Sequence, residues 1–429
     1  MRIVALNPET RKDLLSRLLK RSPSQYPEQE KTVNEIISEI REKKDEALFS
    51  YTEKFDRIRL TPESLYVTEE EIRDAYDEVD PELVRIIRKA IENIRNYHMM
   101  QKRTSWFDCS EGIILGQKVT PLSKVGVYVP GGKASYPSSV LMNVVPARVA
   151  GVGDILVTTP CNALGKVNPT VLVAAKEAGV DRIAKIGGAQ AIAAMAFGTE
   201  SVPKVDKICG PGNIYVALAK KAVYGNVGID SVAGPSEIMV LADASANARY
   251  IAADLMSQAE HDQLASAILV TDSASLAEEV NLEISRQLEG LSRREIIEKS
   301  MENYGYILVA DSMRDAYDAV NEIASEHLEI LTSNPFETMT YIKNAGAIFL
   351  GQYSSEPLGD YYAGPDHILP TNGTAKFFSP LSVDDFVKKS SVISYSREQL
   401  LACGNDIIAF ANAEGLTAHA NSIKQRMEK

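Results

Sequence analysis

Apolar residues in the first hundred positions recur at the spacing of helices. One such run lies within residues 33–40, and a second lies within residues 83–94. Start signals agree with these runs, because residues 80–81 read as an N-cap followed by proline and residues 68–71 as a capping box. The pattern predicts helices with one short strand over this part of the chain.

From about residue 125 the pattern changes to short β-branched runs that alternate with helical stretches. The first block predicts strands over 125–129, 154–158, 182–186 and 205–208, with helices containing 141–149, 171–178 and 189–197. The second block predicts strands near 237–241, 267–270, 306–309, 328–331 and 347–350. Such alternation is typical of parallel sheets built from βαβ units, so we expect two similar α/β domains.

Periodicity is lost over residues 351–380, which are rich in glycine and proline. A long ordered loop of this kind usually carries function. The last part of the chain reads as two helical stretches around a short strand near residues 391–395. This tail is too small to hold a core alone, so it must pack on something else.

Composition narrows the classes of function. Of the 429 residues, 45% are hydrophobic and 24% charged, which predicts a folded globular chain. The 46 basic and 58 acidic residues give a net charge of -12, which disfavours nucleic acid and anionic membranes as partners. Four scattered cysteines and the lack of a signal-like apolar run favour the cytoplasm.

Three predicted strand ends of the first block open into glycine turns before a helix, at residues 128–132, 186–190 and 209–213. Glycine lets the backbone approach a phosphate, and a helix amino end supplies free N–H groups. We expect the turns to meet at the carboxyl edge of the sheet, although none has the usual dinucleotide-binding spacing. Cys209, in the third turn, is either a nucleophile or, more commonly, buried filler.

Histidine is rare, yet four of the five lie beyond residue 260. Gln258 and His261 are three residues apart on a predicted helix, which suits two metal ligands or a solvated face. Glu326 and His327 could act as general acid and general base, or they could form a pair of charges at a helix end. Asp360, in the glycine-rich loop, could be a carboxylate ligand or the cap of a turn.

The chain resembles the histidinol dehydrogenase family over essentially its whole length. The motifs that carry the resemblance lie at residues 127–132, 187–190, 210–213, 233–237, 258–261, 325–328, 360–367 and 414–419. The resemblance implies oxidation of L-histidinol through L-histidinal to L-histidine, with two NAD⁺ reduced, as the last steps of histidine biosynthesis.

The same resemblance assigns roles to individual residues. One zinc ion per subunit would be held by Gln258, His261, Asp360 and His419. The substrate would be bound by these four together with Ser236, His327, His367 and Glu414. Glu326 and His327 would do the proton chemistry, His327 as general base and Glu326 by activating water for aldehyde oxidation. NAD would contact Tyr128, Gln190 and Asn213.

The resemblance also implies a homodimer in which each tail completes the partner's site. The expected fold is thus α/β, with two similar incomplete Rossmann-like parallel-sheet domains, an N-terminal helical segment and an exchanged C-terminal tail. The expected parts are an arm over 1–24, a metal and substrate domain over 25–125 and 236–380, an NAD domain over 126–235, and a tail over 381–429. Two alternatives remain, a zinc hydrolase and a zinc-stabilised dimer without activity.

Overall fold

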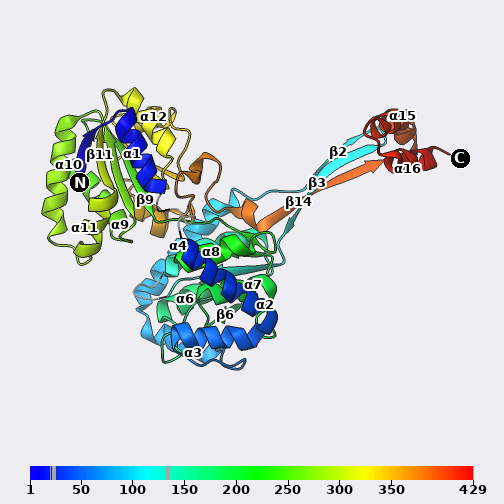
Figure 1. Cartoon of the computed structure of the whole chain (residues 1–429), viewed down its shortest axis with the longest axis horizontal. Coiled ribbons are helices and arrows are strands. Elements are labelled where there is room, and N and C mark those ends of the chain that lie inside the picture. The colour runs from blue at the N-terminus through cyan, green and yellow to red at the C-terminus, as the bar shows by residue number, and fades with distance from the viewer. Residues whose placement is uncertain (20, 22–25, 132–135, 429) are drawn as a thin grey trace. The chain divides into compact units, whose positions relative to one another are not determined.

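The computed structural model describes residues 1–19, 21, 26–131 and 136–428 (Figure 1). Gly132 of the first predicted glycine turn and the predicted boundary at residue 24 lie outside the described residues. The chain forms two compact units, of which the larger holds residues 1–101 and 122–386 and the smaller holds residues 102–121 and 387–429.

One sheet of the larger unit has six parallel strands in the order β1-β11-β10-β9-β12-β13. These strands are β1 (Arg2–Ala5), β9 (Glu237–Ala242), β10 (Ser266–Thr271), β11 (Gly305–Val309), β12 (His327–Leu331) and β13 (Ala347–Leu350). Five of them fall where the second block predicts them, and β1 is a short strand within the first hundred residues, where one was predicted without a position. It adds an edge to a sheet that is otherwise built from residues beyond 236.

Helices cover both faces of this sheet, as parallel strands require. On one face lie α9 (Ala248–Ala259), α10 (Ala274–Leu288) and α11 (Arg294–Tyr304), and on the other α1 (Pro8–Leu19) and α12 (Met313–Ile323) (Figure 1). A short helix, α13 (Pro335–Met339), connects the last two strands. The alternate side chains of each strand therefore enter two separate apolar cores.

The second sheet of this unit has five parallel strands in the order β6-β5-β4-β7-β8. They are β4 (Lys124–Tyr128), β5 (Asp154–Thr158), β6 (Arg182–Ala184), β7 (Lys207–Cys209) and β8 (Gly228–Ile229). The connecting helices are α5 (Pro137–Ala150), α6 (Pro169–Ala178), α7 (Gly188–Phe197) and α8 (Ile214–Val223). The fold is thus the expected α/β arrangement of two parallel sheets.

The N-terminal helices pack on this five-stranded sheet. Helix α2 (Pro27–Asp56) contacts α7 and α8, α3 (Glu69–Glu78) contacts α6, and α4 (Pro81–Met99) contacts α5. Both predicted starts are confirmed, since Thr68 and Glu71 form a reciprocal capping box and the Asp80 side chain caps α4. Helix α4 also contacts the turn over Gly359–Ala363, so the N-terminal helices contact both parts of the larger unit and the predicted domain boundaries stay a prediction.

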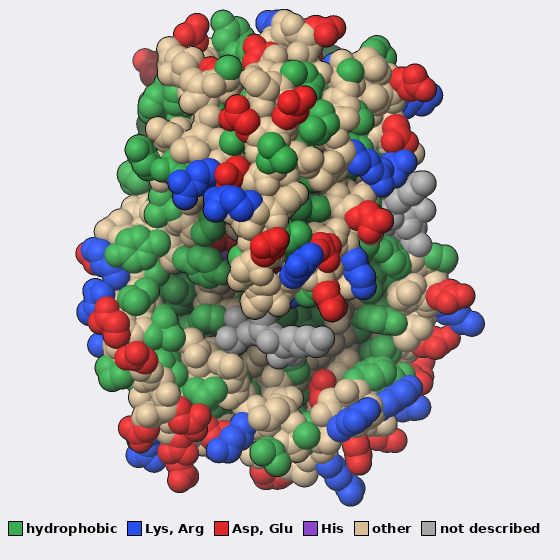
Figure 2. All heavy atoms as spheres, turned by 90° about the vertical axis from the view of Figure 1, so that its left-hand side faces the viewer, with side chains coloured by type: hydrophobic (Ala, Val, Ile, Leu, Met, Phe, Trp, Pro, Cys, Tyr) green, Lys and Arg blue, Asp and Glu red, His purple; other side chains and the backbone are tan. Residues whose placement is uncertain are grey.

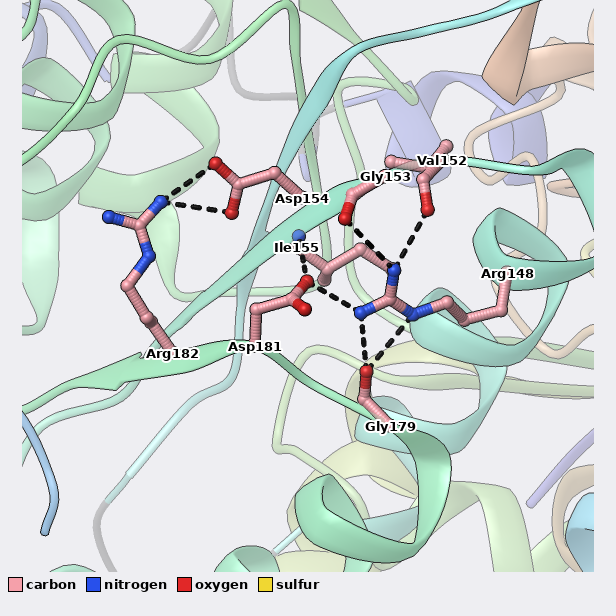
Figure 3. A network of polar contacts seen from close by, with 8 residues as sticks. All are labelled: Arg148, Val152, Gly153, Asp154, Ile155, Gly179, Asp181 and Arg182. Atoms are coloured by element: carbon pink, nitrogen blue, oxygen red, sulfur yellow. Dashed lines mark hydrogen bonds and ion pairs between the residues drawn. The ribbon is translucent and has the colours of Figure 1, made fainter.

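An arginine at the end of α5 ties together the amino edge of the five-stranded sheet (Figure 3). Arg148 donates to the carbonyl of Val152 at 2.8 Å and to Asp181 at 2.5 Å. The same Asp181 carboxylate accepts from the Ile155 N–H at 2.7 Å. The network fixes the start of β5, the strand that lies between β4 and β6 in the sheet.

The smaller unit combines two segments that are far apart in the sequence. Strands β2 (Trp106–Ser110), β3 (Ile113–Pro121) and β14 (Val387–Tyr395) form an antiparallel sheet in the order β14-β3-β2. Helices α15 (Arg397–Ala413) and α16 (Thr417–Met427) follow β14 and pack on each other (Figure 1). The predicted tail is thus not a unit by itself, because its strand needs residues 113–121 as a partner.

Charged side chains of both signs are intermingled on the face shown in Figure 2. No continuous basic band is visible there, in keeping with the negative net charge of the sequence. Within the described ranges, the helices are all too short or too polar to cross a bilayer.

Candidate active site

A cavity of about 1030 Å³ opens at the carboxyl edge of the five-stranded sheet. Its wall includes Gly131, Gly188 and Asn213 from the three predicted turns, and Thr159 and Pro160 after β5. The three turns therefore surround one cavity, as expected for the carboxyl ends of strands in one parallel sheet. A cavity of this size accommodates a ligand as large as a dinucleotide.

The three residues expected to contact NAD all line this cavity. The Tyr128 hydroxyl accepts a hydrogen bond from the Gly188 N–H at 3.2 Å, and burial raises the pKa of Tyr128 to about 12. Gln190 is almost fully buried, whereas Asn213 is exposed and caps α8 by accepting from the Tyr215 and Val216 N–H groups. Tyr128 therefore stays protonated at neutral pH and orders the second glycine turn.

Gly210 is held in a conformation that other residues rarely adopt. Its φ is +113°, and a Cβ there would lie 2.1 Å from the carbonyl oxygen of Tyr128. The Gly210 N–H donates to Asp230 at 2.8 Å, while its carbonyl accepts from Lys220 at 2.9 Å. Lys220 and Asp230 also pair with each other, so a buried ion pair fixes the third turn on both sides.

Cys209, directly before this turn, is fully buried, and burial raises the pKa of its thiol well above the usual value. A thiol in such surroundings is a poor nucleophile. We therefore expect Cys209→Ala to keep most of the turnover number, with a stability loss of about 1 kcal/mol for the small cavity. Steady-state assays and thermal melts check this, and a folded variant that no longer oxidises aldehyde would restore the nucleophile hypothesis.

A second cluster lies at the amino edge of the six-stranded sheet. His327 is the first residue of β12, Glu326 precedes it, and both are more than nine-tenths buried. The backbone of Glu237, the first residue of β9, contacts both of them. Its N–H donates to Glu326 Oε2 at 2.8 Å, and its carbonyl oxygen lies 3.0 Å from His327 Nδ1. The backbone of residue 237 thus contacts both the acidic and the imidazole side chain.

Burial and neighbouring charges set the protonation of this pair. Burial raises the pKa of Glu326 to about 8, although the charge of His327 opposes the shift. Burial would lower the pKa of His327, but the charges of Glu326 and Asp360 outweigh it and raise the value to about 10. The chain alone therefore keeps His327 as the cation at neutral pH, whereas a general base must be neutral. A metal cation at Asp360 would oppose this effect.

Carboxylates and imidazoles converge next to this pair. His327, Glu356 and Asp360 each offer a ligand atom, and the three atoms lie within 4.8 Å of one another. His327 Nε2 is 3.5 Å from Asp360, and His367 Nδ1 is 3.9 Å from the same carboxylate. Burial would raise the pKa of Asp360, but its hydrogen bond to His327 and the charges of both histidines lower it to about 2. Asp360 is thus an anion at neutral pH.

Gln258 and His261 lie at the end of α9, which stops at Ala259. Gln258 is fully buried, so the solvated-face alternative is wrong for it, and among the described residues neither of its amide atoms has a hydrogen-bond partner. His261 is solvent-exposed as a residue. Partial desolvation of its ring lowers its pKa, and the negative charge of Asp360 only partly opposes this shift. An unpaired buried amide and an imidazole beside a carboxylate suit a metal ion.

Glu356 is the residue of this cluster that the sequence pattern did not single out. It lies on α14 (Glu356–Leu358), and Asp360 follows on a π-helical turn (Gly359–Ala363), so this part of the predicted loop is helical. Ser257 donates to Glu356 at 3.0 Å, and burial raises the pKa of Glu356 to about 8. The sequence does contain a signal that could have identified Glu356, because it lies four residues before Asp360, a spacing that brings two side chains to one helix face.

The remaining predicted substrate residues are divided between the two units. Ser236 is half-buried directly before β9, and its carbonyl accepts from the Ser266 N–H at 3.0 Å. Glu414 and His419 belong to the smaller unit, where both side chains are exposed at the start of α16 and the turn before it. Their roles toward metal and substrate remain predictions.

Comparison with known proteins places these two sites in a family context. The family described as histidinol dehydrogenase matches residues 19–427, which include both the cavity and the cluster around His327. The chain belongs to the histidinol dehydrogenase family. It is 58% identical to the histidinol dehydrogenase of Caldanaerobacter subterraneus over 413 residues, or 96% of each chain.

Other members of the histidinol dehydrogenase family agree in length and fold. The enzyme of that name from Halalkalibacterium halodurans is 59% identical over 401 residues, which cover 93% of this chain and 94% of the relative. The crystal structure of histidinol dehydrogenase from Elizabethkingia anophelis has a TM-score of 0.93 at 36% identity and covers 100% of this chain and 98% of its own. The two parallel sheets and the smaller antiparallel sheet are thus the architecture of the family.

Proposed function

We propose that the chain oxidises L-histidinol through L-histidinal to L-histidine, with zinc and two NAD⁺, as the last steps of histidine biosynthesis. The observation that carries the proposal is the buried Glu326–His327 pair beside His261 and Asp360 in a chain of this family. A proton acceptor next to a set of metal ligands is the equipment that oxidation of an amino alcohol needs.

Zinc would be held by Gln258, His261 and Asp360 together with the partner subunit's His419. The unpaired amide of Gln258 supports this set, because a buried polar group without a partner is costly unless a ligand satisfies it. Bound zinc would act as a Lewis acid that orients the substrate through its nitrogen atoms. Ser236, His367 and the partner subunit's Glu414 complete the proposed contacts to substrate.

His327 is the proposed general base for the hydroxyl proton. Its Nδ1 faces the carbonyl of Glu237, which only accepts hydrogen bonds, so Nδ1 carries a proton and Nε2 is the atom left to take one. Nε2 faces the Asp360 carboxylate at 3.5 Å, so a metal ion bound by Asp360 would compete for that carboxylate. Glu326, held by the Glu237 N–H, takes the proton of the water that adds to the aldehyde. Bound NAD⁺ would accept the hydride at each step.

The cofactor would occupy the cavity at the other sheet. Gly188 begins α7 and Asn213 caps α8, so the amino ends of two helices, which carry the positive ends of the helix dipoles, lie at the cavity wall where a pyrophosphate would bind. A zinc hydrolase or an inactive zinc-stabilised dimer would leave this cavity without a role. The cavity therefore favours the oxidoreductase among the three alternatives.

A homodimer with shared sites is part of the proposal. The smaller unit exposes large apolar side chains, among them Phe410 at 72% and Ile393 at 71%, which a solvated surface disfavours. It also carries Glu414 and His419, the two site residues that come from outside the larger unit. An isologous exchange would bury both tails and complete two sites at once.

Turnover of purified protein with L-histidinol and NAD⁺ tests the proposed function. We expect two NADH for each histidinol, followed by the absorbance of reduced nicotinamide, with L-histidine identified as the product by mass spectrometry. Hydrolysis of an ester or amide without NADH formation would favour the hydrolase. A protein with bound zinc and neither activity would favour the structural dimer.

Removal of the metal tests the ligand set. We expect a strong chelator to abolish turnover and added Zn²⁺ to restore it, and His261→Ala to lose bound zinc by elemental analysis. Glu283→Ala is a suitable control, since Glu283 forms a partly exposed ion pair with Arg286 on α10. Full activity of a preparation shown to be free of metal would contradict the proposed ligand set.

A further inference from the structure

Glu237 connects the two groups assigned to proton transfer. Its N–H holds the Glu326 carboxylate and its carbonyl holds Nδ1 of His327, so one residue at the start of β9 positions both. The register of β9 and β12, in which His327 pairs with Ile238, fixes only how the two strands are aligned along their length. The orientation of the two functional side chains therefore depends on where the main chain of residue 237 lies.

The Glu237 side chain is fixed by a distant arginine. Arg21 Nη2 lies 2.5 Å from Glu237 Oε1, and the two residues are 1% and 3% exposed. Arg21 Nη1 also donates to the carbonyl of Leu264 at 2.8 Å, and its guanidinium lies over the ring of Tyr304 at 5.2 Å. Arg21 comes from the segment after α1, so the start of the chain reaches the base of the catalytic cluster.

A buried ion pair is costly to assemble, and removal of one partner leaves an uncompensated charge. Without Arg21, the Glu237 carboxylate would lie unpaired next to the Glu326 carboxyl group. The carboxylate would either turn toward water or take up a proton. Each change would shift the backbone of residue 237 and so alter its hydrogen bonds to Glu326 and His327. A shift of about 1 Å at groups in contact with reacting atoms costs on the order of 100-fold in rate.

We propose that Arg21 is a positioning residue for the reaction, acting through Glu237 to hold Glu326 and His327 in their working orientation. The inference rests on the proposed function for its kinetic readout. Within the described part of the chain, the polar contacts of Arg21 include neither the wall of the cofactor cavity nor the proposed metal ligands, so its effect is expected on the chemical steps. The N-terminal segment is thereby part of the catalytic apparatus.

Kinetics of Arg21→Met test this role against a matched control. We expect kcat for both histidinol and histidinal to fall by about 10- to 100-fold, with KM for NAD⁺ changed less than about twofold. Arg21→Lys should recover part of the loss, and guanidinium ion should partly rescue Arg21→Ala. The control is Arg17→Met, which breaks an exposed ion pair with Asp13 on α1 and should leave all constants unchanged.

A double-mutant cycle separates positioning from loss of stability. Arg21→Met with Glu237→Gln leaves no unpaired charge, so its loss of kcat should be smaller than the product of the two single losses. Folded sites are counted by NAD binding, and kcat is expressed per such site. If Arg21→Met lowers the melting temperature but keeps the wild-type kcat, the positioning role is wrong. Losses of kcat that simply multiply in the double variant would also contradict it, because Arg21 would then act independently of Glu237.

A readout without turnover distinguishes this inference from the proposed function. In ¹⁵N-histidine NMR of the full-length protein supplied with Zn²⁺, His327 should show a protonated Nδ1 in wild type and a mixture of ring tautomers in Arg21→Met. His327→Gln assigns the signal. If wild type does not oxidise histidinol, the proposed function fails while this signature still decides the role of Arg21. An unchanged His327 spectrum in Arg21→Met would overturn it.

Discussion

Glu326→Gln should slow the oxidation of histidinal by about 100- to 10,000-fold and that of histidinol much less. The amide keeps the shape of the side chain and its contact with the Glu237 N–H, but it cannot take a proton from water. Because burial raises the pKa of Glu326 to about 8, the carboxylate form increases as pH rises through 8. The aldehyde step of wild type should therefore accelerate over this range.

Supplying histidinal directly to each variant isolates the second step. The rise with pH should disappear in Glu326→Gln, while His327→Gln should slow both oxidations. Glu322→Gln is a matched control, since Glu322 lies on α12 in a partly exposed ion pair with Arg11. Equal losses on both substrates in Glu326→Gln would remove water activation as its role.

Mixing two inactive variants should restore about a quarter of wild-type activity. His261→Ala and His419→Ala should each be inactive alone, because every site then lacks one proposed ligand. After they are unfolded and refolded together, random pairing makes half of the dimers mixed, and each mixed dimer has one intact site of two. The intact site combines His261 of one subunit with the partner subunit's His419.

The pair His261→Ala and Gln258→Ala provides the matched control for this experiment. Both side chains lie at the end of α9, so a mixed dimer would have one altered ligand in each site and no recovery. Zinc content should follow the same pattern as activity. A site completed within one chain predicts no recovery in either mixture, and this result would contradict the exchanged tail.

Local patterns predicted the strands well, because a strand buried on both faces must be apolar along its length. The predictions for β5 and β13 match the observed ends, and those for β9 to β12 differ by a residue or two. Strands β2, β3 and β8 were not predicted: all five residues of β2 are exposed, none of the nine residues of β3 is buried, and β8 has only two residues. Without a buried face, these strands lack the apolar pattern on which the prediction rested.

The position of the candidate site was harder to predict. The glycine turns lie at carboxyl strand ends as expected, but Glu237 and His327 are the first residues of their strands, so the other cluster lies at an amino edge. Burial of Gln258 depends on how α9 packs against the sheet, which its sequence spacing does not contain. Glu356 was missed because its neighbours suggested an irregular loop.

The pairing of β3 with β14 has a consequence for how the chain folds during synthesis. Pro121 pairs with Val387, so at about 5 to 20 residues per second the hairpin of β2 and β3 leaves the ribosome roughly 10 to 50 seconds before its third strand. Through that interval one edge of β3 is unpaired, with exposed side chains such as Phe107 and Leu115 nearby. The nascent hairpin is therefore open to aggregation and to chaperone capture during this interval.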